Sequence, residues 1–152
     1  MSETPSSYNG FIIYFAAPLF SNAERAWNKR LRDYLVERTG YTVFLPQERC
    51  AGHPPEDIYP ICKGGVDRSQ MVLAILEGSD ADSGTSWEAG YAKGCGKPVV
   101  GVRTDFRKCE YKNVNMMLYA SCDVMVEDFS GSDEKLFAKI VEAIRTVLYA
   151  GT

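Results

Sequence analysis

Short, continuously apolar runs alternate with longer amphipathic stretches along most of the chain. The apolar runs are of strand length and contain many β-branched or aromatic residues. They are Phe11–Ala16, Tyr41–Leu45, Met71–Leu76, Val99–Val102 and Val124–Val126. Strands that are apolar on both faces are typical of a parallel sheet covered by helices on both sides. The pattern therefore predicts an α/β fold: a single doubly wound domain of the flavodoxin or Rossmann type, with about five parallel strands flanked by helices.

The amphipathic stretches predict the helices. In the first of them, apolar side chains recur at helical spacing, with Ser21 or Asn22 as the N-cap and Gly40 as the C-terminal stop. Gly64-Gly65 weakens the second, and a glycine and a Pro-Pro pair make Gln47–Pro55 a predicted loop. The predicted helices are Ala23–Glu37, Asp57–Arg68, Thr85–Gly94, Val114–Ala120 and Asp133–Tyr149.

The length of 152 residues fits one domain, which we place at residues 11–150, preceded by a flexible lead-in at residues 1–10. A net charge of −3, without a cluster of Lys or Arg, argues against binding to nucleic acid. The longest apolar runs are far shorter than a membrane span, and the lead-in has no apolar core of a secretory signal. We therefore expect no membrane association and a cytoplasmic location.

The five cysteines form no CxxC pair, and the chain has a single histidine. This composition lacks both a Cys/His zinc pattern and an obvious histidine-assisted nucleophile, and it predicts reduced thiols. A metal site made of Asp80, Asp82 and Glu88 has no further marker, so we expect neither a metal nor a cofactor.

The most informative stretch is Glu77–Gly94, in which an apolar strand runs through an acidic, glycine-bearing turn into a helix. Open α/β sheets bind ligands at the carboxyl ends of their strands. Asp82 and Glu88 lie six positions apart across that turn and can face one small pocket; paired carboxylates are typical of chemistry at an anomeric carbon. An ionised Glu88 near a helix N-terminus can attack such a carbon. Taken alone, a surface cap explains Glu88 better, and Asp82 is ordinary as a turn residue or an N-cap; the combination of strand, acidic turn and helix favours a functional role.

Several segments, in order along the chain, resemble the nucleoside 2-deoxyribosyltransferases. Asp82–Ala92 with Gly96–Val99 resembles the signature of that family, and Tyr14–Phe20 resembles its opening motif. Pro46-Gln47 and Asn113–Met117 also fit. The resemblance covers most of the chain, and it adds a specific chemistry to the fold class.

The resemblance implies transfer of a 2-deoxyribosyl group between nucleobases by double displacement, with retention of configuration. Glu88 matches the nucleophile that forms a covalent deoxyribosyl intermediate. Asp82 matches the acid that exchanges a proton with the base. Tyr14 matches a residue that orients the catalytic carboxylate, although a core aromatic explains it equally well on sequence alone.

The resemblance also implies the substrate contacts and partners. Gln47 matches a contact to the base, and Asn115 matches a contact to the sugar hydroxyl that a neighbouring subunit provides. Gly84, Ala16 and Pro18, which belong to the matching motifs, complete the predicted substrate-binding set. The partners expected are 2′-deoxyribonucleosides, nucleobases and further copies of the chain, in a dimer or larger homo-oligomer. Without the resemblance, a surface loop explains Gln47 better, and a helix start explains Asn115.

Two alternative functions stay open. The related deoxynucleoside monophosphate N-glycosidases carry a serine-rich phosphate site where this chain has Ala16-Ala17-Pro18. A nucleotide-binding module without turnover would use the same fold. One departure bears on base preference, because some family members have an aspartate at the position of Cys62. The apolar, Met-rich stretch Val114–Tyr119 suits either a subunit contact or a core-facing helix.

Overall fold

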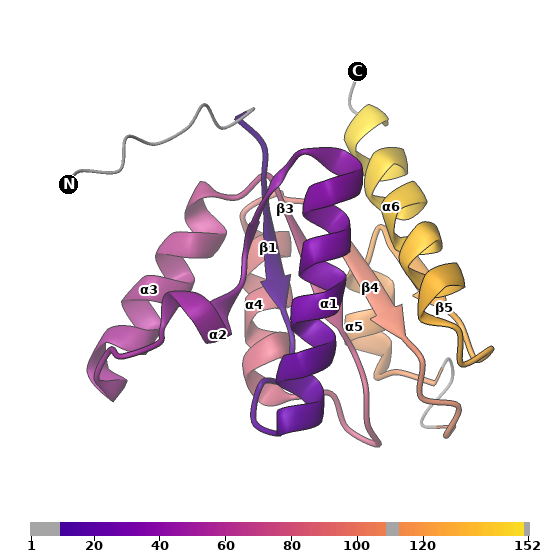
Figure 1. The fold of residues 1–152 in the computed structure, drawn as a ribbon, viewed down its shortest axis with the longest axis horizontal. Coiled ribbons are helices and arrows are strands. Elements are labelled where there is room, and N and C mark those ends of the chain that lie inside the picture. The colour runs from indigo at the N-terminus through magenta and orange to yellow at the C-terminus, as the bar shows by residue number, and fades with distance from the viewer. Residues whose placement is uncertain (1–9, 109–112, 151–152) are drawn as a thin grey trace.

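Five strands hydrogen-bond side by side in a computed structural model of the protein, and every neighbouring pair is parallel (Figure 1). The strands are β1 (Ile12–Ala16), β2 (Thr42–Phe44), β3 (Met71–Ile75), β4 (Val99–Arg103) and β5 (Val124–Glu127). Their order in the sheet is β2-β1-β3-β4-β5. The structure describes residues 10–108 and 113–150, so all of the expected lead-in except Gly10 lies outside the described residues.

Helices cover both faces of this sheet, which confirms the predicted fold class (Figure 1). Helices α1 (Asn22–Thr39) and α6 (Asp133–Tyr149) pack on one face. Helices α3 (Pro55–Arg68), α4 (Ser83–Gly94) and α5 (Met116–Ser121) cover the other. No helix of the described residues is both long enough and apolar enough to span a bilayer.

The ends of α1 follow the predicted capping residues. The Ser21 side chain accepts a hydrogen bond from the backbone N–H of Glu24, whose carboxylate accepts one from the Ser21 N–H in return. Gly40 ends the helix at φ 70°, a left-handed conformation in which glycine carries no steric cost.

A short helix, α2 (Pro46–Arg49), overlaps the start of the stretch Gln47–Pro55 that was predicted as a loop, and there the prediction was wrong. Pro46 occupies its first turn, where a residue without an N–H group is tolerated. Four residues are too few to show a helical period in the sequence, so no pattern distinguishes such a turn from a loop.

The pleat of β1 decides where its side chains go. Ile13 and Phe15 pack towards α1 and α6, whereas Tyr14 and Ala16 face the layer of α3 and α4. The Tyr14 ring stacks on Phe44 of the neighbouring strand, with ring centroids 5.1 Å apart. The chain thereby directs a buried tyrosine towards the helix that carries the acidic signature.

Strands β1 and β3 are neighbours, and the chain leaves their carboxyl ends towards opposite faces of the sheet. Beyond β1 it continues into α1, and beyond β3 it continues into α4. This divergence is the topological switch point, where open α/β sheets form a crevice for ligands.

Candidate active site

A tyrosine and a glutamate meet in the crevice. The Tyr14 hydroxyl, from the buried strand β1, donates a hydrogen bond of 2.6 Å to Oε1 of Glu88 on α4. Tyr14 is completely buried, and its pKa lies far above its ordinary value because of burial and the neighbouring Glu88 charge. The hydroxyl therefore stays protonated and holds one oxygen of the carboxylate in place. A surface cap does not explain this glutamate.

The protonation of Glu88 is balanced near neutrality. Burial raises the pKa of the Glu88 carboxyl to about 7; the Tyr14 hydrogen bond lowers it, and the charge of Asp82 raises it. A carboxyl with such a pKa is ionised in about half of the molecules at pH 7. An ionised carboxylate that has lost most of its water is a better nucleophile than a solvated one.

Asp82 is the N-cap of α4. Its Oδ2 atom accepts hydrogen bonds from the N–H of Thr85 at 2.8 Å and from the Thr85 hydroxyl at 3.0 Å. The N-cap alternative is therefore realised, and it does not compete with a role in the site, because Asp82 and Glu88 line the same cavity. The cap holds the Asp82 carboxylate in the wall of this cavity.

The cavity that these acids line has a volume of about 410 Å³, within the range of small-molecule sites. Gln47, at the second position of α2, lines it together with Gly84. The Gln47 amide accepts from the buried Asn28 at 3.1 Å and donates to the Arg25 carbonyl at 3.0 Å. These two hydrogen bonds fix the orientation of the Gln47 amide. One N–H and one lone pair of the oxygen stay available for other partners.

The other predicted contacts lie elsewhere. Ala16 is completely buried in the sheet. Pro18 lines a separate cavity of about 490 Å³ beside α1, and its carbonyl accepts a hydrogen bond from Asn28. The predicted site residues thus fall into two groups. Tyr14, Glu88, Asp82, Gly84 and Gln47 gather around the crevice, whereas Ala16, Pro18 and Asn115 do not line it.

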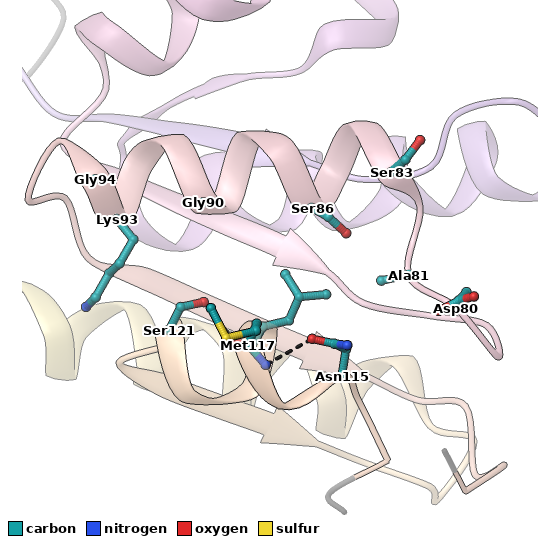
Figure 2. A pocket seen from close by; sticks show the side chains of 11 residues that line it. Asp80, Ala81, Ser83, Ser86, Gly90, Lys93, Gly94, Asn115, Met117 and Ser121 are labelled. Carbon is teal, nitrogen blue, oxygen red and sulfur yellow. Dashed lines mark hydrogen bonds between the residues drawn. The ribbon is translucent and has the colours of Figure 1, made fainter. Parts of the chain in front are cut away.

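Asn115 lines a third cavity, of about 740 Å³, between α4 and α5 (Figure 2). It is the N-cap of α5, and its Oδ1 accepts a hydrogen bond of 2.9 Å from the Met117 N–H. The α4 residues that line this cavity are Ser83, Ser86, Gly90, Lys93 and Gly94. The two cavities use different residues of α4, so within one chain Asn115 and Glu88 do not share a pocket.

Sequence reasoning missed the residues that hold the loops of the site. The Glu77 carboxylate, two residues beyond the end of β3, accepts from the N–H groups of Thr104 and Asp105 and from the Thr104 hydroxyl. The buried Arg103 donates to the carbonyls of Leu76 and Gly78. These bonds tie the loop that leads to Asp82 to the end of β4. Neither residue belongs to a recognisable spacing, so only the fold brings them together.

No group of three or more His, Cys, Asp or Glu within the described ranges is arranged to hold a metal ion. Of the acids that the sequence offered as a metal site, Asp82 is a helix cap and Glu88 is bound by a tyrosine, whereas Asp80 lines a different cavity. The geometry is that of two carboxylates in different environments within one cavity, a common arrangement for acid, base and nucleophile roles.

The family model for nucleoside 2-deoxyribosyltransferases matches residues 13–143. The chain belongs to the nucleoside 2-deoxyribosyltransferase family. This confirms the resemblance that the motifs indicated. A search of curated proteins finds no match to the chain.

Solved structures of this fold include transferases and an N-glycosidase. A conserved protein from Enterococcus faecalis V583 is 24% identical, with a TM-score of 0.72 over 90% of this chain and 98% of that one. The 2-desoxiribosyltransferase from Leishmania mexicana is 24% identical, with a TM-score of 0.67 over 87% and 97%. The CMP N-glycosidase BcmB from Clostridium botulinum is 18% identical, with a TM-score of 0.63 over 85% and 96%. At these identities the likeness is one of fold.

Proposed function

We propose that the protein transfers the 2-deoxyribosyl group of a 2′-deoxyribonucleoside from one nucleobase to another, with Glu88 as the nucleophile. The observation that carries the proposal is the 2.6 Å hydrogen bond from the Tyr14 hydroxyl to Glu88 in the crevice. It holds one carboxylate oxygen and leaves the other to attack carbon. Membership of the family supports the substrate class.

In the first step, a Glu88 oxygen bonds to C1′ and the C1′–N bond breaks, with its electron pair leaving on the base. Asp82 donates a proton to the leaving base, which therefore departs as a neutral molecule. In the second step, a ring nitrogen of the incoming base attacks C1′, loses its proton to Asp82 and expels Glu88. Two inversions at C1′ restore the original configuration, as in other retaining reactions at anomeric carbons.

In this scheme the incoming base binds to oriented hydrogen-bonding groups in the wall of the cavity. The Gln47 amide, oriented by Asn28 and by the Arg25 carbonyl, offers one donor and one acceptor. Both are hydrogen-bonding groups of the kind that read the edge of a nucleobase. Ala16-Ala17-Pro18 offers no hydroxyl for a phosphate, so a nucleoside suits this chain better than a nucleotide.

Asn115 enters the scheme through a second copy of the chain. It lines a different cavity from Glu88, so a contact to the same sugar requires the asparagine of a neighbouring subunit. Met117 beside it is 81% exposed, as expected for an apolar side chain that packs against a partner. We therefore propose a homo-oligomer, at least a dimer, in which each site is built from two chains.

The decisive experiment incubates the protein with deoxyinosine and free adenine and follows the products chromatographically. Deoxyadenosine is the expected product, and intact-mass measurement without acceptor should detect a deoxyribosyl adduct that Glu88→Ala abolishes. Glu142→Ala, which alters an exposed glutamate on α6, is the matched control. Release of free hypoxanthine without a new nucleoside would show that the protein is an N-glycosidase and not a transferase. Binding without either product would indicate a non-catalytic module.

Assembly has its own test. Mixing inactive Glu88→Ala chains with inactive Asn115→Ala chains should restore part of the activity, because mixed oligomers contain sites with both groups intact. Exchange of subunits is monitored by mass spectrometry of differently tagged chains. A fully active monomer, or exchange without recovery of activity, would refute the shared site while leaving the role of Glu88 untouched.

A further inference from the structure

Two cysteines lie side by side in the wall of the candidate active site. The sulfur atoms of Cys50 and Cys62 are 3.6 Å apart, at van der Waals contact. Cys50 follows the last turn of α2 as its C-cap, and Cys62 lies in α3. Both line the 410 Å³ cavity with Glu88 and Asp82.

Access and chemistry distinguish this pair from the other described cysteines. Neither Cys50 nor Cys62 is fully buried, and both line the cavity, so small molecules that enter the cavity can reach them. Cys95 lies on the surface, and Cys122 packs beside Gly101 and Met125, so neither has another thiol as its described neighbour. The described cysteines therefore offer one place where two thiols can react with one another.

We propose that Cys50 and Cys62 form an oxidisable dithiol site, which a hydroperoxide converts into a disulfide across the wall of the cavity. In the first step, the Cys50 thiolate attacks the terminal oxygen of the hydroperoxide ROOH, so that an S–O bond forms, the O–O bond breaks and RO⁻ leaves, which is hydroxide in the case of hydrogen peroxide. In the second step, the Cys62 sulfur attacks the sulfenic sulfur, the S–S bond forms, and the oxygen leaves as water with the Cys62 proton. The two thiols lose two electrons, and the peroxide gains them.

The order of the steps follows from the surroundings of the two thiols. Burial raises the pKa of the Cys62 thiol to about 12, so its thiolate is scarce. The neighbouring Tyr14 hydroxyl lowers this pKa, but burial outweighs it. Cys62 is thus the poorer first nucleophile, and it serves as the resolving thiol.

The disulfide would reshape the site. An S–S bond of ~2.05 Å draws the sulfurs together by about 1.5 Å compared with the observed contact. The link joins α2, which carries Gln47, to α3, and it moves Cys62 relative to Tyr14 and therefore relative to the Glu88 hydrogen bond. Since a misplacement of ~1 Å can cost roughly 100-fold in rate, oxidation should lower activity by roughly 10- to 100-fold.

Mass spectrometry tests the bond without reference to the activity. Trypsin cuts after Arg49 and Lys63, so both cysteines fall in one peptide, residues 50–63. After hydrogen peroxide treatment and alkylation, this peptide should be unalkylated and lighter by two hydrogen atoms, and dithiothreitol before alkylation should restore both alkylation sites. Recovery of the peptide with two alkylated cysteines after peroxide would overturn the proposal.

The activity arm rests on the proposed function and is kept separate. Peroxide should inactivate the wild type and Cys95→Ser alike, reversibly with dithiothreitol, whereas Cys50→Ser should lose the reversible component. Inactivation that proceeds equally in Cys50→Ser would overturn the link between the disulfide and the site. If the protein turns over no nucleoside at all, the mapped disulfide still decides whether the dithiol site exists.

Discussion

Replacing Glu88 by glutamine should change how the stability of the protein depends on pH. The folded protein raises the pKa of this carboxyl from an ordinary 4.5 to about 7, chiefly through burial. Between these two values the folded chain binds a proton at Glu88 that the unfolded chain releases. The stabilisation of the folded state by this proton is therefore fully present below pH 4.5 and is lost as the pH rises through 7.

The size of the loss follows from the two pKa values. A difference between 4.5 and about 7, at ~1.36 kcal/mol per pH unit, gives about 3 kcal/mol, nearly all of which is lost by pH 8. Glutamine cannot ionise, and its carbonyl can still accept the Tyr14 hydrogen bond. The free energy of unfolding of Glu88→Gln, relative to wild type, should therefore be higher at pH 8 than at pH 4.5 by about 3 kcal/mol.

Urea unfolding at the two pH values measures this difference, with the fluorescence of Trp27 and Trp87 as the signal. Glu142→Gln is the matched control, because Glu142 is exposed on α6 and should show a difference near zero. If Glu88→Gln and wild type differ by the same amount at both pH values, the carboxyl does not carry a raised pKa in the folded protein. The mutant should at the same time have lost transfer activity, which separates a gain in stability from a loss of function.

Three further changes have expected outcomes. Tyr14→Phe removes the hydrogen bond that lowers the pKa of Glu88, so the acid limb of the pH–rate profile should move up by about 1–2 pH units; an unmoved limb would contradict the pairing. Asn is as good an N-cap as Asp, so Asp82→Asn should change the free energy of unfolding by less than ~0.5 kcal/mol. The rate of transfer between ordinary bases should nevertheless fall ~10²–10⁴-fold, because the amide cannot exchange a proton with the base. Turnover of a nitrophenyl deoxyriboside, whose leaving group needs no proton, should be spared, and equal losses for both substrates would exclude proton transfer. Lys97→Met removes an ammonium that donates to three backbone carbonyls at the end of α3, so the free energy of unfolding should fall by about 2 kcal/mol in urea titrations; an unchanged value would show that water replaces these bonds.

The sheet and its long helices were predictable because they depend on local composition. Met71–Leu76 is apolar at every position and of strand length, as a strand buried on both faces requires, and β3 runs over Met71–Ile75. The caps of α1 were equally readable, because Ser21 and Gly40 act through backbone groups within a few residues. In both cases the physical cause lies inside the segment.

The wall of the site was not predictable in the same way. Gln47 owes its orientation to Asn28 and to the Arg25 carbonyl, which lie on another helix. The contact between Cys50 and Cys62 depends on how α2 and α3 are placed, and the sequence indicated only reduced thiols. The residues in question were visible in the sequence, but their partners are set by the packing of separate elements.

The placement of Glu88 also depends on the packing of separate elements. Gly64-Gly65 weakens α3 by local propensity, at a cost of about 1 kcal/mol for each glycine relative to alanine. Yet a Cβ at Gly65 would lie 2.7 Å from the ring of Phe44, and this ring stacks on Tyr14, which in turn holds the Glu88 carboxylate. A residue that is unfavourable for its own helix thus allows the close approach that positions the tyrosine. Local and tertiary preferences conflict there because the site depends on the outcome of the packing, and such conflicts are expected near functional residues.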